Sequence, residues 1–165
     1  MDLILWRHAE AEDGLEDQSE AGAPQGNDLE RSLTSRGEKQ AIRMANWLDR
    51  QLPEGTRILV SPARRCEQTA LALGRKYKIR AELAPGATPV QLLELVQWPA
   101  AKSLILIVGH QPTLGQTVAQ LLGLQERECP VKKGAVWWLR YRRREREHDS
   151  AGQTVVVTVQ SPEVL

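Results

Sequence analysis

Three short segments of this chain carry the residue types that phosphoryl chemistry needs. Arg7 and His8 follow one apolar run, residues 61–65 with two arginines follow a second, and Gly109 and His110 follow a third. Arginine presents paired, planar N–H donors that match phosphate oxygens, and a neutral imidazole can attack phosphorus to form a covalent intermediate. A lone histidine or arginine has an ordinary structural explanation, so the joint occurrence of the three segments carries the prediction of a phosphate site.

The elements that position these segments are those of an α/β domain. Short apolar runs alternate with helical periods, which predicts a mostly parallel, mixed central sheet of about six strands. The predicted strands are residues 3–6, 57–61, 79–83, 103–108, 135–141 and 154–160, with the last two forming a terminal pair. Ligands of open α/β sheets bind beyond the carboxyl ends of the strands, so we expect the three segments to meet in one cleft.

Four helices are predicted between the strands. Thr34 is a suitable N-cap for the first, and Ser61 with the proline after it supplies a cap and a first-turn proline for the second. Residues 90–96 form the third, and Pro112 begins a fourth that ends at Gly123. The amide groups at the starts of the second and fourth helices then add donors for an anion at the predicted cleft.

Composition and charge narrow the function classes. The 165 residues suit one domain over 1–165, and 22 Lys and Arg against 21 Asp and Glu give a net charge of +1, which excludes a general nucleic-acid binder. No apolar run reaches the ~20 residues of a membrane span or the length of a signal-peptide core. Cys66 and Cys129 fit no zinc or redox spacing. We expect a cytoplasmic monomer that needs no metal and no cofactor.

Two polar segments stand apart from the strand and helix pattern. Residues 10–30 have no hydrophobic period and follow the first strand, and a loop of that length is usually functional or disordered. Residues 140–148 contain five arginines. Two interpretations of this second segment stay open, a solvated hairpin tip and a binding patch for an acidic partner.

In combination, these segments resemble the motifs of the histidine phosphatase superfamily, also called the phosphoglycerate mutase-like family. Arg7-His8-Ala9 stands in the place of the family's Arg-His-Gly after the first strand. Residues 61–70 read SPARRCEQTA where the family has S-P-x-x-R-x-x-Q-T-A, and Gly109 with the histidine after it matches the G-H motif. The resemblance covers most of the chain in the correct order and implies the family's three-layer α/β/α sandwich.

The resemblance also implies a role for each matching residue. His8 is the residue that becomes phosphorylated, and Arg7, Arg65 and His110 hold the phosphoryl oxygens and stabilise charge during the transfer. The motif places its arginine four residues after the serine, which selects Arg65 over Arg64. The serine itself is expected to be an N-cap and not a ligand.

The substrate class depends on a position of the family pattern that this chain leaves unfilled. Larger members carry a glutamate after the third strand that protonates a leaving alkoxide, and here only Glu82 lies nearby, without the rest of that motif. Glu82 is therefore a candidate acid, together with acids of the 10–30 loop such as Asp13 and Glu16. An alkoxide leaves poorly without a proton donor, whereas imidazole, whose pKa is near ~6.5, leaves readily.

We therefore expect a phosphatase that acts on phosphohistidine in a partner protein of the phosphotransfer or phosphotransferase-system type. The small size and the late strand at 154–160 resemble the compact bacterial phosphohistidine phosphatases of the SixA type. Two alternatives stay open, a small-molecule phosphatase or mutase on the same fold and a non-catalytic phosphoprotein-binding module. A cysteine phosphatase based on Cys66 is excluded, because that chemistry needs an arginine six positions later and Ala72 stands there.

Overall fold

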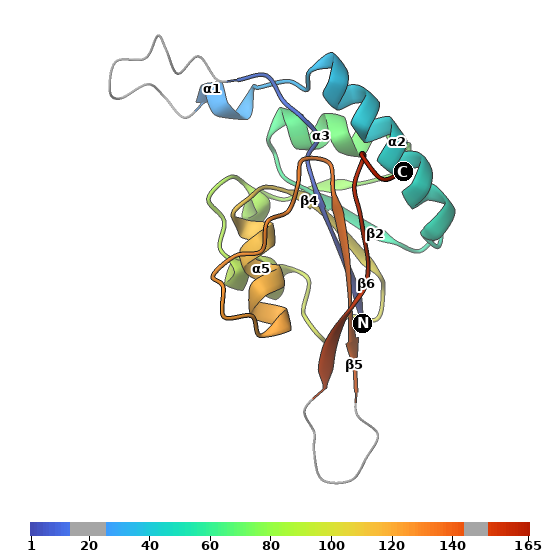
Figure 1. Ribbon diagram of the computed structural model, residues 1–165, viewed down its shortest axis with the longest axis vertical. Helices are drawn as coiled ribbons and strands as arrows, with labels where there is room; N and C mark the ends of the chain where they lie inside the picture. The colour runs from blue at the N-terminus through green and yellow to red at the C-terminus, as the bar shows by residue number, and fades with distance from the viewer. Residues whose placement is uncertain (14–25, 144–151) are drawn as a thin grey trace.

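Six strands form one mixed sheet in the order β3-β2-β4-β1-β5-β6 (Figure 1). In the computed structural model, which describes residues 1–13, 26–143 and 152–165, the strands are β1 (Asp2–Arg7), β2 (Arg57–Val60), β3 (Lys78–Ile79), β4 (Ile105–Gly109), β5 (Val136–Arg142) and β6 (Gln153–Gln160). The first four in the sheet order run parallel, whereas β1 with β5 and β5 with β6 are antiparallel pairs. The predicted mixed sheet and terminal strand pair are confirmed.

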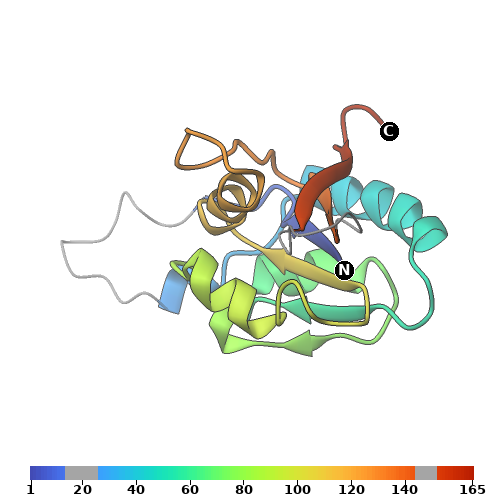
Figure 2. The ribbon, with the colours of Figure 1, turned by 90° about the horizontal axis from the view of Figure 1, so that it is seen from below.

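Helices cover both faces of the sheet (Figure 2). They are α1 (Gly26–Leu29), α2 (Ser35–Gln51), α3 (Arg64–Leu71), α4 (Pro89–Leu95) and α5 (Thr113–Leu122). Successive side chains of β1 point to opposite faces, so Ile4 and Trp6 pack with α2 and α3, while Leu3 and Leu5 pack with α4 and α5. Because both faces are buried, the central strands are continuous apolar runs in the sequence. The predicted α/β/α sandwich is confirmed.

The predicted helix caps are right at two helices and wrong at the third. Thr34 begins α2, because its side-chain oxygen accepts a hydrogen bond from the backbone N–H of Gly37 at 2.9 Å. Gly123 ends α5 in the left-handed conformation, with φ at 64°. Ser61 does not cap α3, whose N-cap is Ala63 and has no side-chain cap bond.

The third predicted strand is wrong over most of its length. β3 contains two residues at the edge of the sheet, and Ala81–Leu83 form a 3-10 turn. The turn buries Leu83, which is 3% exposed, whereas Ile79 in the strand is 42% exposed. Since an edge strand has one neighbour, little apolar burial favours its extension, and the chain buries its leucine by turning back.

The two polar segments lie partly outside the described residues. Within 10–30, residues 26–29 form α1 where a loop was predicted, and 14–25 are not described. Within 140–148, Arg140 belongs to β5, where its Nε and Nη2 donate to the Asp2 carboxylate at 2.8 Å each, and 144–148 are not described. Among the helices of the described part, none is long and apolar enough to cross a bilayer.

Candidate active site

Strand register brings the three polar segments to one edge of the sheet. Arg7 in β1 pairs with Gly109 in β4, and Val60 in β2 pairs with Val108 in β4. The ladder continues past the strands, because the N–H of His8 donates to Gly109 O at 3.1 Å and the N–H of Ser61 donates to Val108 O at 3.0 Å. The carboxyl ends of β1, β2 and β4 therefore meet, as the sequence predicted.

A cavity of about 170 Å³ opens at this edge. It is lined by Arg7, His8, Ala11, Asp13, Arg31, Arg65, Pro85, His110, Gln111 and Lys133. The structure thus brings together the four residues that the motifs selected. Glu82 is not among the lining residues; it lies on the 3-10 turn, where Arg80 Nη2 donates to its Oε1 at 3.0 Å.

His8 is buried, and its ring is held as a neutral imidazole. Its Nδ1 lies 2.8 Å from Ala9 O, and because a carbonyl only accepts, Nδ1 carries the proton and Nε2 keeps its lone pair. Burial, with added repulsion from Arg65 and Arg7 and against the opposing effect of the Ala9 bond, lowers the pKa of His8 to about 4. Burial is therefore the larger cause of the low pKa of His8, and the arginine charges are the smaller one.

We predict that His8 titrates near pH 4 in the ligand-free enzyme, because protonation would place an unsolvated charge beside two arginines. Histidine-selective NMR over the pH range in which the protein stays folded measures this value directly. Below the titration the imidazolium has no lone pair for attack; above it the ring is neutral and competent. A His8 ring that titrates near the ordinary ~6.5 would contradict the prediction.

His110 is also neutral and has partners at both ring nitrogens. Arg65 Nη2 lies 3.3 Å from His110 Nδ1, and since a guanidinium only donates, Nδ1 accepts. His110 Nε2–H then donates to Ser61 Oγ at 2.7 Å, which explains why that hydroxyl is buried in the site. Burial, with added repulsion from His8 and Arg65, lowers the pKa of His110 to about 3. The two rings lie 5.3 Å apart between centroids.

Two buried arginine N–H groups at the site have no partner among the described residues, Arg7 Nε and Arg65 Nε. Arg7 is otherwise fixed by Nη1 donating to Val131 O at 2.8 Å. Buried donors without acceptors are rare in proteins, and a cluster of them beside cationic groups is typical of an anion site. The site therefore has unused donors for an anion.

The selection of Arg65 over Arg64 matches their places on α3. Arg65 is 3% exposed and points into the site, whereas Arg64 is exposed on the helix surface. Cys66 is the next residue, and burial raises the pKa of its thiol to about 12. At neutral pH that sulfur stays protonated, which agrees with the exclusion of a cysteine nucleophile.

Sequence reasoning missed Asp28 and Arg31, which form a hydrogen-bonded chain with Arg65. Asp28 of α1 accepts from Arg65 Nη1 at its backbone O, at 2.6 Å, and from Arg65 Nη2 at Oδ2, at 3.1 Å. Arg31 Nε donates to Asp28 Oδ1 at 3.0 Å. Burial raises the pKa of Asp28, but the charges of Arg65 and Arg31 lower it more, so this carboxyl is ionised and is no proton donor. The sequence signal that could have indicated this pair is the spacing of Asp28 and Arg31, three residues apart and shortly before the N-cap Thr34.

Comparisons with known proteins agree with this geometry. The family model for the histidine phosphatase superfamily (branch 1) matches residues 3–88. The phosphohistidine phosphatase SixA homolog of Haemophilus influenzae is 31% identical over 139 residues, which span 74% of this chain and 78% of that protein. Phosphohistidine phosphatase SixA of Escherichia coli is 34% identical over 129 residues, 73% of this chain and 74% of that protein.

A solved structure gives the same result for the whole chain. The protein histidine phosphatase SixA complexed with tungstate superposes with a TM-score of 0.70 at 26% identity, covering 99% of each chain. The predicted fold and the predicted enzyme class, a phosphatase, are confirmed by these matches. The strand order and the cluster of residues at the carboxyl ends of the strands agree with these matches. The chain therefore belongs to the histidine phosphatase superfamily.

Proposed function

We propose that this enzyme removes the phosphoryl group from a phosphohistidine on a partner protein, with His8 as the covalent nucleophile. The observation that carries the proposal is the free Nε2 of a neutral, buried His8 in one cavity with Arg7 and Arg65. Two similar proteins carry the name phosphohistidine phosphatase. A similar solved structure holds tungstate, which is a tetrahedral oxyanion like phosphate.

In the first step, the lone pair of His8 Nε2 forms a bond to phosphorus while the phosphorus–nitrogen bond of the substrate breaks. The substrate histidine leaves as a neutral imidazole when its far ring nitrogen already carries a proton. The leaving atom then needs no acid from the enzyme. The Nδ1–H bond to Ala9 O stabilises the His8 ring as it becomes positive.

In the second step, a water oxygen forms a bond to phosphorus and the electron pair of the phosphorus–Nε2 bond returns to His8. Both hydrogens of this water leave on the product, H2PO4⁻, and His8 is neutral again. The unpartnered N–H groups of Arg7 and Arg65 stabilise the phosphoryl oxygens in both steps. His110 lines the same cavity beside Arg65, and we assign it a part in holding these oxygens.

The acids of the site favour phosphohistidine over alkyl phosphates. Glu82, at the place of the family's acid, lies outside the cavity and is bound to Arg80. Asp28 is ionised between two arginines. Asp13 is the carboxylate among the lining residues, and its side chain is exposed. A substrate that carries its own proton suits this site better than an alkoxide does.

We predict a steep dependence of the rate on the leaving group. Across aryl and alkyl phosphates, kcat/KM should fall by about a hundredfold or more as the leaving-group pKa rises, because that is the smallest usual contribution of a general acid. A phosphohistidine peptide should be turned over faster than any alkyl phosphate. The measurement is a series of steady-state rates with one enzyme preparation, and a flat dependence would show that a working acid exists.

The second candidate function is a small-molecule phosphatase in which Asp13 is that acid. It is favoured by the place of Asp13 in the cavity lining. Under this alternative, Asp13→Asn slows alkyl phosphates and leaves aryl phosphates unchanged. Glu12→Gln is the matched control, because Glu12 is the exposed neighbour and does not line the cavity. Under the phosphohistidine proposal, both variants and Glu82→Gln leave phosphohistidine turnover near the wild-type rate.

A further inference from the structure

A second cavity, of about 230 Å³, lies beside the active site on α2. We call it the α2 groove; its lining is Arg36, Lys39, Gln40, Arg43, Pro162 and Glu163. Three of these side chains are basic and stand at helical spacing, so they form one stripe along α2. The proposed reaction uses none of them.

The α2 groove joins the mouth of the active site through two backbone segments. Glu10, two residues after His8, donates its N–H to Gln40 Oε1 at 3.0 Å, and its carboxylate lies 4.0 Å from Arg36 Nε. On the other side, the N–H of Gly134 donates to His8 O at 3.0 Å. Pro162 packs closely against Gly134: a Cβ atom placed on Gly134 would lie only 2.9 Å from Pro162 Cγ. A partner protein bound in the α2 groove would therefore contact the rim of the catalytic cavity.

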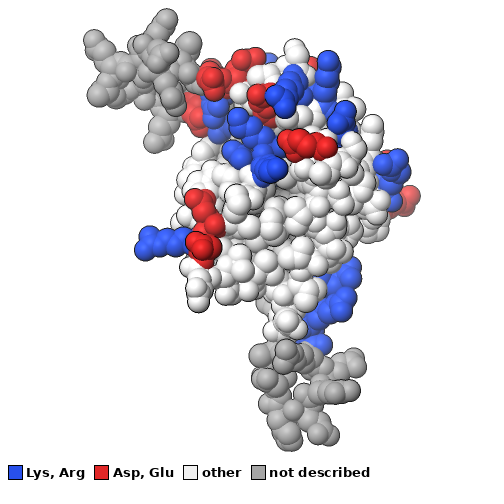
Figure 3. Space-filling view, viewed as in Figure 1, with Lys and Arg blue, Asp and Glu red and all other residues white. Residues whose placement is uncertain are grey.

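Both cavities have an excess of positively charged side chains in their linings. Seven Lys and Arg and two Asp and Glu line them, although the whole chain carries 22 and 21. Figure 3 shows basic side chains gathered, with a few acids among them, over the end of the molecule that carries α1 and α2, while the centre of that face is largely uncharged. Such a local excess attracts a partner of opposite charge and raises the rate of productive encounter.

Several of these cations are already engaged, and others face solvent. Arg65 is bound to Asp28, and Arg43 Nη1 donates to Pro162 O at 3.0 Å. Lys39 on α2 and Lys133 at the active-site rim are exposed, and within the described residues neither forms an ion pair. These two lysines, one in the lining of the α2 groove and one in the lining of the catalytic cavity, are the charges most available to a partner.

We propose that the α2 groove and Lys133 form a docking surface for an acidic face of the phosphorylated protein, beside the histidine that enters the cavity. The inference rests on the proposed function, because a small-molecule substrate would not reach α2. It also explains how an enzyme with a catalytic cavity of about 170 Å³ selects a protein substrate, because the protein surface around the phosphohistidine is recognised outside that cavity. Charge at the rim of an interface acts mainly on association and on its salt dependence.

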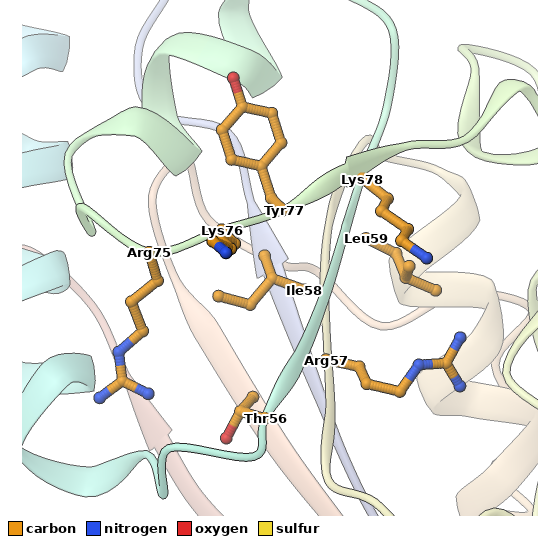
Figure 4. A pocket seen from close by; sticks show the side chains of 8 residues that line it. All are labelled: Thr56, Arg57, Ile58, Leu59, Arg75, Lys76, Tyr77 and Lys78. Carbon is orange, nitrogen blue, oxygen red and sulfur yellow. The ribbon is translucent and has the colours of Figure 1, made fainter.

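A second basic groove provides the matched control. It has a volume of about 510 Å³ and lies between β2 and residues 75–78; Figure 4 shows Arg75 on one side and Arg57 and Lys78 on the other, with Ile58 between them. Arg57 begins β2, whereas the active site follows the carboxyl end of that strand. Arg75 Nε also donates to Asp49 Oδ1 at 2.9 Å. This groove therefore has similar charge at the opposite end of the sheet.

The test compares two phosphohistidine peptides of equal length, one flanked by Asp and Glu and one by Lys. The wild-type enzyme should have a KM about fivefold lower for the acidic peptide, the size of effect expected from one or two exposed charge pairs. Lys39→Glu should remove that preference and flatten the dependence of KM on salt, while changing kcat little. Lys76→Glu, the same charge change in the groove of Figure 4, should keep the wild-type preference.

Each contrary outcome points to a different failure. Equal KM values for the two peptides in the wild-type enzyme, or an unchanged preference in Lys39→Glu, overturn the docking surface and leave the proposed function intact. A loss of preference in Lys76→Glu and not in Lys39→Glu moves the docking surface to the other groove and also overturns the proposal. Turnover of aryl phosphate with no turnover of either peptide refutes the proposed function, and the docking surface with it.

Discussion

His8→Ala is expected to abolish turnover and to remove the covalent intermediate at the same time. The wild-type enzyme, quenched during turnover of a labelled substrate, should carry a phosphate that is acid-labile and base-stable, as a phosphoramidate is. The reason is geometric: His8 Nε2 is the free ring nitrogen at the cavity, while both nitrogens of His110 are already bonded. Loss of a covalent nucleophile removes the reaction path itself, so we expect a fall of at least about a thousandfold.

Two further variants separate this effect from a folding defect. His8→Gln keeps most of the side-chain volume in the buried site, and it should still bind inorganic phosphate or tungstate through the arginines while forming no intermediate. His148→Ala, which changes the third histidine of the chain, should keep both the label and the rate. A label that survives in His8→Ala, or undiminished turnover there, would refute the assignment. Phosphate binding without turnover in the wild-type enzyme would instead indicate a non-catalytic binding module.

The strands that carry the site could be predicted because a strand that is buried on both faces is a continuous apolar run in the sequence. β1, β2 and β4 are apolar at every central position, and their parallel order brings Arg7, Ser61 and His110 to one edge. β3 could not be predicted in the same way. Its two residues are exposed at the sheet edge, and Leu83, the last residue of the predicted strand, is buried by a 3-10 turn.

The partners of the site residues were harder to predict than the residues themselves. Asp28 and Arg65 are 37 positions apart, and their ion pair exists only after α1 and α3 have been placed. Ser61 has the residue type and position of a cap, yet it accepts a hydrogen bond from His110, which local sequence does not show. The low pKa of both histidines has the same origin, because burial is a property of the fold and not of neighbouring residue types.

Arg65→Lys is expected to lower kcat/KM by about tenfold to a hundredfold although the charge is kept. One charge-assisted hydrogen bond contributes roughly 1.5–3 kcal/mol, and each ~1.4 kcal/mol is a factor of ten in rate. In the folded protein, Asp28 occupies Nη1 and Nη2 of Arg65, so the edge with Nε is the one left for the phosphoryl oxygens. A lysine has one nitrogen, which cannot serve Asp28, His110 and an oxyanion together.

The control for this variant is its neighbour on the same helix. Arg64 is exposed, so Arg64→Ala should change kcat/KM by less than about twofold and leave the Tm unchanged. If Arg65→Lys acts through the phosphoryl group, it weakens the binding of inorganic phosphate as well as the rate, which damage to folding alone would not do at a temperature where the variant is folded. Equal losses in Arg64→Ala and Arg65→Lys, or normal phosphate binding in Arg65→Lys, would show that Arg65 orders Asp28 and α1 without holding the substrate.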